Sequence, residues 1–308
     1  MNQRSFLIFL LCMFIFPLYA ADNQSLVLKK VTNNTWSIVG PLTDRTRENL
    51  GNNATFGFIV TDEGIVVIDS GGSLEGAKLI HQLVKSVSNK PIRYVINTGG
   101  QDHRWFGNDY FSALGAKIIS STAARQDHKA RLNTQWARME TGIGKKGIKG
   151  TREKFADIVF NDEYKFKLGN TDFEIYFRGQ AHTPGDAFIW LPQSKVMFTG
   201  DIVYTERMLG IGEQSKSKTW LAAFDAMAAF KPVHVVPGHG SPTTLKIAIR
   251  DSRDYIAYLR QSIAAFIEQG GDASEISKVN QSRFKYLKNS ELLSGRNALK
   301  VYTELEWE

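Results

Sequence analysis

The spacing of hydrophobic and polar positions predicts a chain in which short strands alternate with helices. Alternation predicts two short strands within Leu26–Val39, and Thr55–Val60 with Gly64–Ser70 predicts a β-hairpin. After Ser73, apolar positions three and four residues apart predict a capped helix to about Val87. The remaining strands are expected at Arg93–Asn97, Ala116–Ser120, Ile158–Leu168, Phe173–Phe177, Ala187–Leu191, Lys195–Thr199 and His234–Val236.

The same pattern predicts further helices and one open segment. The glycine-rich segment Gly142–Gly150 indicates a loop, either a plain surface loop or a mobile lid, and the tail Ala273–Tyr302 is expected to be helical with breaks at Asn289 and Gly295. Two β-rich halves with helices outside would bury two sheets against each other, which predicts a four-layer α/β/β/α sandwich, although periodicity alone also permits an α+β fold. The other helices are expected at Phe111–Leu114, Thr122–Glu140, Thr219–Phe230 and Leu245–Glu268.

The first twenty residues have the pattern of an export signal. Arg4 precedes a mostly apolar run, and the small residues Ala20 and Ala21 precede polar Asp22. A membrane anchor is the alternative, but the run is short for a span. We therefore expect cleavage near Ala20 and a periplasmic or secreted protein without a stable membrane anchor. Residues 21–308 are expected to form a single domain with a helical C-terminal extension from about residue 263.

Composition narrows the chemistry. The chain has 308 residues, 43% hydrophobic and 22% charged, so whole-chain disorder is excluded. The one cysteine, Cys12, lies in the signal, so a transition-metal site has to come from the six histidines and from carboxylates. The net charge of +7 is interspersed, and the densest basic stretch, Lys145–Arg152, has no interleaved aromatic residues. We therefore expect a small-molecule substrate and no nucleic-acid partner.

Polar residues of metal-binding type stand directly after several predicted strands. Loops at strand ends can bring ligands together from distant parts of a sequence. Imidazole and carboxylate groups suit Zn²⁺, and also iron or manganese. The other histidines, His81, His128 and His234, lie inside predicted helices or a strand and are expected to be structural or solvated. The candidate residues are Asp69, Asp102, His103, His182, Asp201 and His239.

These motifs resemble those of the metallo-β-lactamase superfamily. The matching pieces are Gly57–Val60 through Ile68–Gly71, the strand Tyr94–Thr98, AHTPGD at residues 181–186, FTGD at 198–201 and PGHG at 237–240, over about residues 26–262. The resemblance implies the αββα sandwich, with a metal site at one edge between the sheets. It also implies that His182 is the third histidine ligand, that Asp201 bridges and that His239 is the last ligand. Asp69 would orient a ligand rather than bind metal.

One loop departs from the family pattern. Members usually carry His-x-His-x-Asp-His here, whereas residues 99–104 read GGQDHR. One alignment keeps Asp102 and His103 in the last two motif positions and is preferred because it retains ligand chemistry. The other places His103 at the aspartate position and Arg104 at the final histidine. The missing histidines then fall on Thr98 and Gly100 in the first alignment, and on Gly99 and Gln101 in the second.

The preferred alignment implies one metal rather than two. Asp102, His103, Asp201 and His239 would hold one Zn²⁺, with iron as an alternative, and His182 would bind it weakly or serve as an acid or base. The catalytic candidates are Asp102 and His182, and the adjacent Arg104 would recognise an anionic substrate group. One metal-activated water would then hydrolyse a small ester, thioester, lactone or amide. The alternative is a catalytically silent binding or accessory protein, and iron redox chemistry is a less favoured third reading.

Overall fold

The structure is a computed structural model that describes residues 26–308, so the predicted export signal lies outside the described residues. It contains two mixed β-sheets. The first has seven strands in sequence order, antiparallel from β1 to β4 and parallel from β4 to β7. They are β1 (Val27–Lys30), β2 (Thr35–Val39), β3 (Thr55–Val60), β4 (Ile65–Ile68), β5 (Ile92–Ile96), β6 (Lys117–Ser121) and β7 (Ile158–Phe160).

The second sheet has five strands in the order β12-β11-β10-β9-β8. Its neighbours are antiparallel except β11 and β12, which run parallel. The predicted hairpin across residues 192–194 is confirmed by the pairing of β10 with β11. The strands are β8 (Glu163–Leu168), β9 (Thr171–Phe177), β10 (Ala187–Leu191), β11 (Val196–Phe198) and β12 (His234–Val236).

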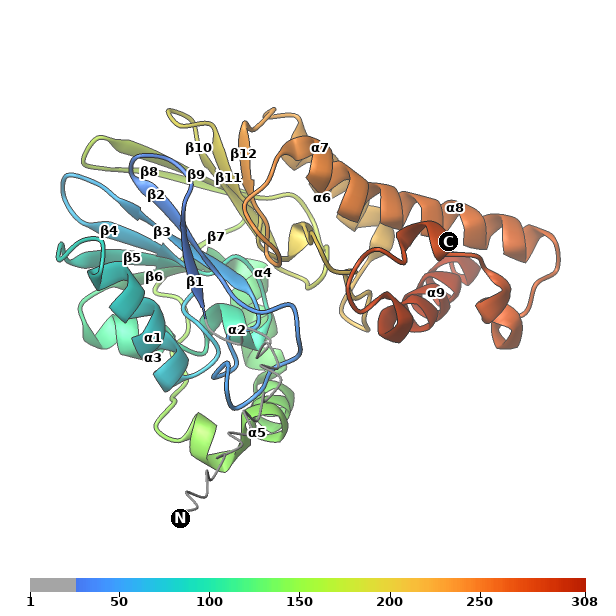
Figure 1. The fold of residues 1–308 in the computed structure, drawn as a ribbon, viewed down its shortest axis with the longest axis horizontal. Helices are drawn as coiled ribbons and strands as arrows, with labels where there is room; N and C mark the ends of the chain where they lie inside the picture. Colours follow the sequence, from blue (N-terminus) through green and yellow to red (C-terminus); the bar gives the residue numbers. More distant parts are fainter. Residues whose placement is uncertain (1–25) are drawn as a thin grey trace, which may run out of the picture.

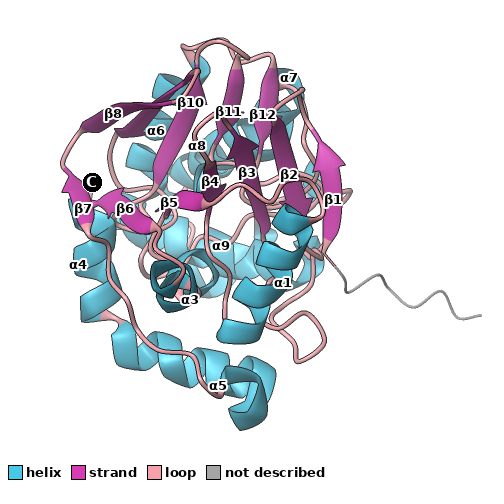
Figure 2. Cartoon of the chain, turned by 90° about the vertical axis from the view of Figure 1, so that its left-hand side faces the viewer, coloured by secondary structure: helices cyan, strands magenta, loops and turns pink. Residues whose placement is uncertain are grey.

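The layers follow from which faces are apolar. Side chains such as Ile96 and Ile189 fill the space between the two sheets. On the outer face of the first sheet, α1 (Leu74–Lys85) and α3 (Asn108–Ala113) pack through residues such as Ile80 and Phe111 (Figures 1 and 2). The helices α6 (Ser217–Ala228), α8 (Asp254–Glu268) and α9 (Ser290–Glu306) share the core on the outer face of the second sheet. The predicted four-layer α/β/β/α sandwich is confirmed.

The segment predicted as a loop at Gly142–Gly150 is mostly helical, so that prediction is wrong. The predicted long helix divides into α4 (Thr122–Ala130) and α5 (Leu132–Ile148), and α5 continues past Gly142 with a break at Gly144, whose φ is 77°. The helix persists because Met139 and Ile143 are buried against Trp105 and Phe106.

The C-terminal region is helical almost throughout. A short α7 (Leu245–Ala248) continues through a π-turn, Ile249–Arg253, into α8, and 3₁₀ turns follow at 273–278 and 282–284. The break at Asn289 is confirmed by its φ of 64° before α9. The break predicted at Gly295 is wrong, because α9 runs through it with Leu293, Ala298 and Val301 buried. Within residues 26–308 no helix is long and apolar enough to cross a membrane.

Candidate functional site

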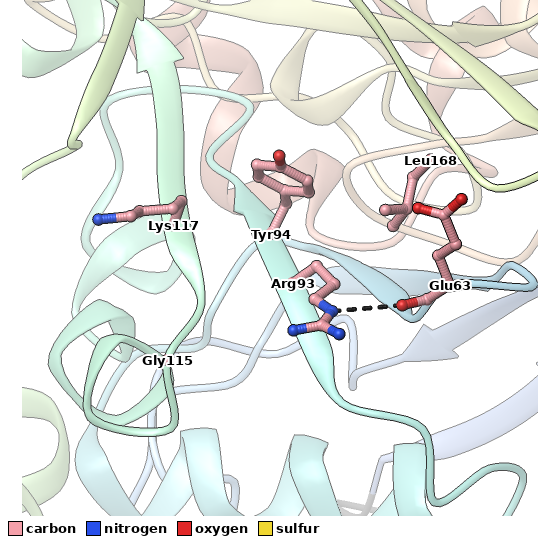
Figure 3. Close-up of a pocket in the computed structure, with 6 residues that line it drawn as sticks. All are labelled: Glu63, Arg93, Tyr94, Gly115, Lys117 and Leu168. Carbon is pink, nitrogen blue, oxygen red and sulfur yellow. Dashed lines mark hydrogen bonds between the residues drawn. The ribbon is translucent and has the colours of Figure 1, made fainter.

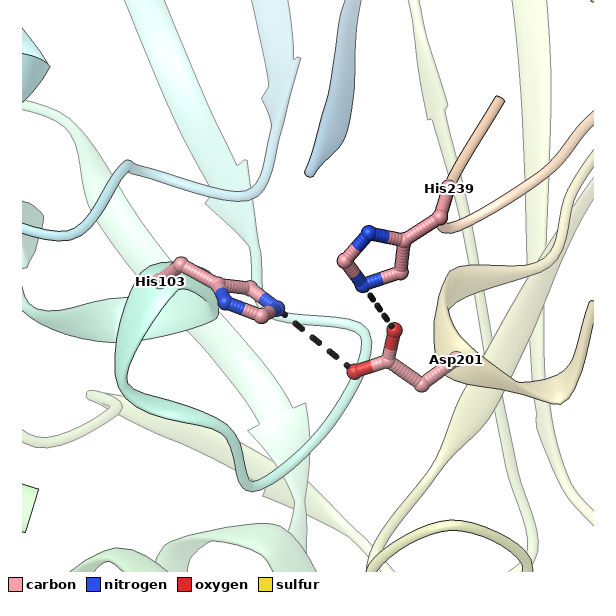
Figure 4. A group of neighbouring side chains, drawn as sticks. All are labelled: His103, Asp201 and His239. Carbon is pink, nitrogen blue, oxygen red and sulfur yellow. Dashed lines mark ion pairs between the residues drawn. The ribbon is translucent and has the colours of Figure 1, made fainter. Parts of the chain in front are cut away.

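Three buried side chains from separate strand ends form a group that could hold a metal. His103 comes from the short α2 (Asp102–Trp105) after β5, Asp201 follows β11, and His239 follows β12. Their ligand atoms all lie within 4.8 Å of one another. Nε2 of His239 lies 3.3 Å from Oδ1 of Asp201, and Nε2 of His103 lies 3.7 Å from Oδ2 (Figure 4). The topology thus brings together residues more than 130 positions apart.

The protonation states of this group suit a cation. Burial lowers the pKa of His239 to about 3 and that of His103 well below its usual value, so both rings are neutral at pH 7. Burial alone would raise the pKa of Asp201, but the Arg104 guanidinium and the two rings hold it well below its usual value. Nε2 of His103 has no hydrogen-bond partner within the described part of the chain. Two neutral imidazoles and one carboxylate therefore fit one Zn²⁺ or iron ion.

Arg104, expected to contact substrate, is instead wholly buried beneath the group. It donates to Asp69 Oδ2 at 2.8 Å and to Asp201 Oδ1 at 2.7 Å. The same guanidinium also donates to the carbonyl oxygens of Thr55 and Gly238. It does not line the cavity described below. Its position instead compensates two buried carboxylates and ties three loops together.

Asp69 acts on the group through Arg104. Its carboxylate accepts from the backbone N–H of Thr98 at 2.7 Å and from the Thr98 hydroxyl at 2.8 Å. Burial raises the pKa of Asp69 to about 6, and the nearby Arg104 opposes that rise. Asp69 is not a member of the group of close ligand atoms, and it contacts Arg104 rather than one of the three candidate ligands.

Asp102, expected as a ligand, lies outside the group and behind the ring of His103. Its Oδ1 accepts from Arg45 Nε at 2.6 Å and from the backbone N–H of His103 at 2.8 Å. Oδ1 also lies 3.6 Å from Nδ1 of His103, whereas the buried Oδ2 has no partner among residues 26–308. Nη2 of Arg45 donates to the same Nδ1 at 2.8 Å. Arg45 and Asp102 therefore compete for one nitrogen of His103.

His182 also lies outside the group of close ligand atoms, and its tautomer is fixed. Nδ1 donates to the carbonyl of Gly210 at 2.9 Å, so Nε2 carries a lone pair. The side-chain N–H of Gln101 donates to this Nε2 at 2.6 Å. Burial lowers the pKa of His182 to about 4, so the ring is a neutral proton acceptor.

The loop before Gln101 packs tightly against neighbouring side chains at the positions where the two missing histidines of the motif would lie. A Cβ at Gly99 would lie 2.3 Å from Asp186 Oδ1, and a Cβ at Gly100 would lie 1.9 Å from Asp127 Oδ2. The hydroxyl of Thr183 accepts from the N–H of Gly100, which holds the loop in place. No side chain fits at either glycine without moving this packing.

A cavity of about 400 Å³ opens above the group. Gln101, His103, His182 and His239 are among the residues that line it. The lining also includes five arginines that no sequence motif marks. They are Arg45, Arg131, Arg138, Arg207 and Arg296.

A second depression, of about 480 Å³, lies elsewhere on the first sheet (Figure 3). It is lined by Arg93, Tyr94 and Lys117 at the beginnings of β5 and β6, with Glu63 and Leu168 beside them. The candidate ligands follow the opposite ends of the strands. Its lining holds no histidine, so the 400 Å³ cavity is the one associated with the chemistry.

Comparisons with known proteins match one family over more than half of the chain. Residues 51–239 match the family described as the Metallo-beta-lactamase superfamily. The chain is 27% identical over 212 residues to Metallo-beta-lactamase type 2 of Elizabethkingia meningoseptica, a match that covers 66% of this chain and 75% of that protein. It is 18% identical to the Linear primary-alkylsulfatase of a Pseudomonas strain, over 71% of this chain and 48% of that one.

Solved structures show the same fold at low identity. A metallo-beta-lactamase from Pontibacter korlensis superposes with a TM-score of 0.59 at 20% identity, covering 73% of this chain and 95% of that chain. The sec-alkyl sulfatase PisA1 superposes with a TM-score of 0.72 at 18% identity, covering 91% of this chain and 50% of that chain. The wider match includes part of the C-terminal helical region, since the unmatched tenth of the chain is smaller than that region.

Proposed function

Because this chain belongs to the metallo-β-lactamase superfamily, we propose that it is a hydrolase that uses a single metal ion held by His103, Asp201 and His239. The observation that carries the proposal is the mutual approach of these three buried side chains beneath a cavity. A bound Zn²⁺ would lower the pKa of water and polarise a substrate carbonyl. Small esters, thioesters, lactones and amides are the proposed substrates.

Asp102 then supports His103 instead of binding the metal. Binding through Nε2 of His103 leaves its proton on Nδ1, where Arg45, which can only donate, is unsuitable as a partner. Asp102 Oδ1, 3.6 Å from Nδ1, is an acceptor that can take over this hydrogen bond. A carboxylate behind a ligand histidine fixes its tautomer and strengthens it as a ligand.

His182 is the proposed proton acceptor. The Gly210 carbonyl holds the proton of the ring on Nδ1, so that Nε2 faces the cavity with its lone pair. Gln101 keeps this nitrogen in position until a substrate or water replaces the amide. His182 then receives a proton as the nucleophile forms and returns it to the leaving group.

These contacts favour the second of the two loop alignments. Gln101 touches His182, as a residue at a histidine position of the motif would, and His103 joins Asp201 and His239 at the aspartate position. In this alignment the first metal site keeps only His182 and the bridging Asp201, which are too few protein ligands for tight binding. The proposal is therefore one metal ion, with the alignment through Asp102 set aside.

Metal content tests the proposal. We expect about one equivalent of zinc or iron per chain after purification without chelator. His103→Ala and His239→Ala should each lose it, whereas Gln101→Ala should retain it. Asp102→Asn should retain the metal at saturation but bind it about 10- to 100-fold more weakly. The matched control is His234→Ala, because His234 is half-buried in β12 outside the group.

The outcome also separates the proposal from a catalytically silent accessory protein. Metal-loaded protein should hydrolyse at least one member of a panel of chromogenic esters, lactones, a cephalosporin and an aryl sulfate. The sulfate is included because two relatives are named as alkyl sulfatases. Absence of metal, with unchanged thermal stability after chelation, would refute the hydrolase and leave the silent reading.

We also propose that the protein is exported and acts in the periplasm or outside the cell. The support is the charge, apolar run and small residues within Met1–Ala21. N-terminal sequencing of the protein recovered from periplasmic extract or medium should begin near Ala21. Recovery from the cytosol with Met1 intact would contradict export.

A further inference from the structure

The cavity above the metal group contains a buried arginine that forms no direct ion pair within residues 26–308. Arg207 is 8% exposed and lines the cavity. Its Nε has no hydrogen-bond partner in the described part of the chain, and no carboxylate there lies within ion-pair distance of its guanidinium. Asp44 and Glu213 also line the cavity; Asp44 and Asp201 attract the guanidinium and oppose the fall in its pKa that burial causes, but none of the three forms an ion pair with it. A buried charge left unpaired is costly, so folded proteins normally pair it or use it to bind a ligand.

Arg207 is connected to the metal group through aromatic stacking. Its guanidinium carbon lies 5.9 Å from the ring centre of Tyr204. The Tyr204 ring in turn stacks on His239, with centres 4.5 Å apart and planes 17° from parallel. The Tyr204 ring therefore lies between the Arg207 guanidinium and a candidate ligand histidine.

The other arginines of the cavity differ in how they are paired. Arg45 is bound to Asp102, and Arg131 is bound to Asp127, so their charges are compensated. Arg138 and Arg296 stand at the exposed rim without a carboxylate partner among residues 26–308, and Arg138 reaches only the amide oxygen of Gln101, at 3.5 Å. The rim cations would attract an anion, and the buried Arg207 would hold it.

We propose that this cavity binds substrates carrying an oxyanion group, with Arg207 as the buried residue that recognises the anion. The planar guanidinium matches a carboxylate, sulfate or phosphate through two parallel hydrogen bonds. This inference rests on the proposed function for the identity of the reaction. The binding of the anion is independent of it.

Calorimetric titration tests the binding directly. The probes are monomethyl succinate, inorganic sulfate and inorganic phosphate, at an ionic strength held constant with chloride, and neutral dimethyl succinate is the comparison compound. We expect the anionic probe with the highest affinity to bind the wild type at least tenfold more tightly than dimethyl succinate does. Arg207→Met should weaken that binding about 10- to 100-fold, the loss typical of one charged hydrogen-bonded pair. Arg207→Lys should retain part of it.

The control is Arg152→Met, because Arg152 is an exposed arginine paired with Asp109 away from the cavity. An equal loss in Arg152→Met, or binding within twofold of wild type in Arg207→Met, would overturn the proposal. Thermal unfolding separates recognition from a structural role. Arg207→Met should change Tm by no more than a few degrees, since it breaks no ion pair and removes only the contact with the Tyr204 ring and long-range attraction to Asp44 and Asp201.

A kinetic arm relates binding to the reaction. The ratio of kcat/KM for 4-nitrophenyl hemisuccinate to that for 4-nitrophenyl butyrate should fall by the same factor in Arg207→Met. If the protein binds no metal and hydrolyses no member of the substrate panel above, but anion binding still depends on Arg207, the proposed function fails while this inference stands. If both esters are hydrolysed with equal ratios in wild type and Arg207→Met, the inference fails while the proposed function stands.

Discussion

Replacement of Arg104 by methionine tests the charge balance at the centre of the site. The guanidinium is wholly buried and bonds two buried carboxylates, Asp69 at 2.8 Å and Asp201 at 2.7 Å. Methionine retains the apolar stem but leaves both carboxylates without their cation. Removal of one partner from a buried pair costs about 3 to 5 kcal/mol. For a chain of this size that corresponds to a fall of roughly 10 °C in Tm.

The measurement is thermal and urea-induced unfolding of chelator-treated protein, so that metal binding does not contribute. The double variant Arg104→Met with Asp69→Asn should lose about 1 to 3 kcal/mol less unfolding free energy than the two single variants lose in sum. The reason is that Asp69→Asn removes one of the two uncompensated charges. Arg152→Met, which breaks an exposed pair, should change the unfolding free energy by no more than about 0.5 kcal/mol. If Arg104→Met unfolds within 2 °C of wild type, Arg104 does not compensate the two carboxylates as argued.

Three further predictions concern pH, helix stability and metal. Burial, with a further contribution from Asp201, raises the pKa of Asp186 to about 8, so folding takes up a proton here between about pH 4 and pH 8. The stability tied to this proton is complete below the unfolded pKa and is lost as pH rises towards 8. The unfolding free energy of Asp186→Asn, measured by urea titration, should therefore rise relative to that of wild type by about 1.4 kcal/mol for each pH unit across this window. A pH-independent difference between the two proteins would contradict the raised pKa. Gly295→Ala should raise Tm by a few degrees, since a Cβ there meets nothing within 4 Å and alanine favours a helix interior by about 0.5 to 1 kcal/mol, and a lower Tm would show that α9 is distorted at this residue. Saturation with zinc at about 100 times its Kd should stabilise wild type by about 2.7 kcal/mol and leave His103→Ala unchanged, whereas equal stabilisation of both proteins would place the metal elsewhere.

Much of the fold could be predicted from local patterns. The strands and α1 follow from apolar alternation and from the cap at Ser73, whose hydroxyl accepts from the N–H of Gly76. The errors at Gly142 and Gly295 have one cause. Glycine lowers local helix propensity, but burial of neighbours such as Met139 and Val301 stabilises the helix through tertiary contacts that a local pattern does not contain.

The site was predicted less completely, for a geometric reason. His103, Asp201 and His239 were identified because each follows a strand in a recognisable motif. The roles of Asp102 and Arg104 were missed because a shift of one residue in the loop exchanges a side chain facing the cavity for one facing inwards. Arg207 carries no sequence signal, since its importance comes from being buried without a partner.

The altered loop and the arginines together account for one metal ion rather than two. Gly99 and Gly100 leave no room for side chains, because Asp186 and Asp127 occupy the space. Beside them, Gln101 Oε1 accepts from Arg45 at 3.2 Å and lies 3.5 Å from Arg138. Arg138, which has no carboxylate partner among residues 26–308, thus acts on the one remaining histidine of that half, His182, and its charge opposes a second cation there. The half with His103, Asp201 and His239 has the opposite balance, because the charge of Arg104 is shared between Asp201 and Asp69. A metal ion is therefore favoured at His103, Asp201 and His239, and a second one is opposed beside His182.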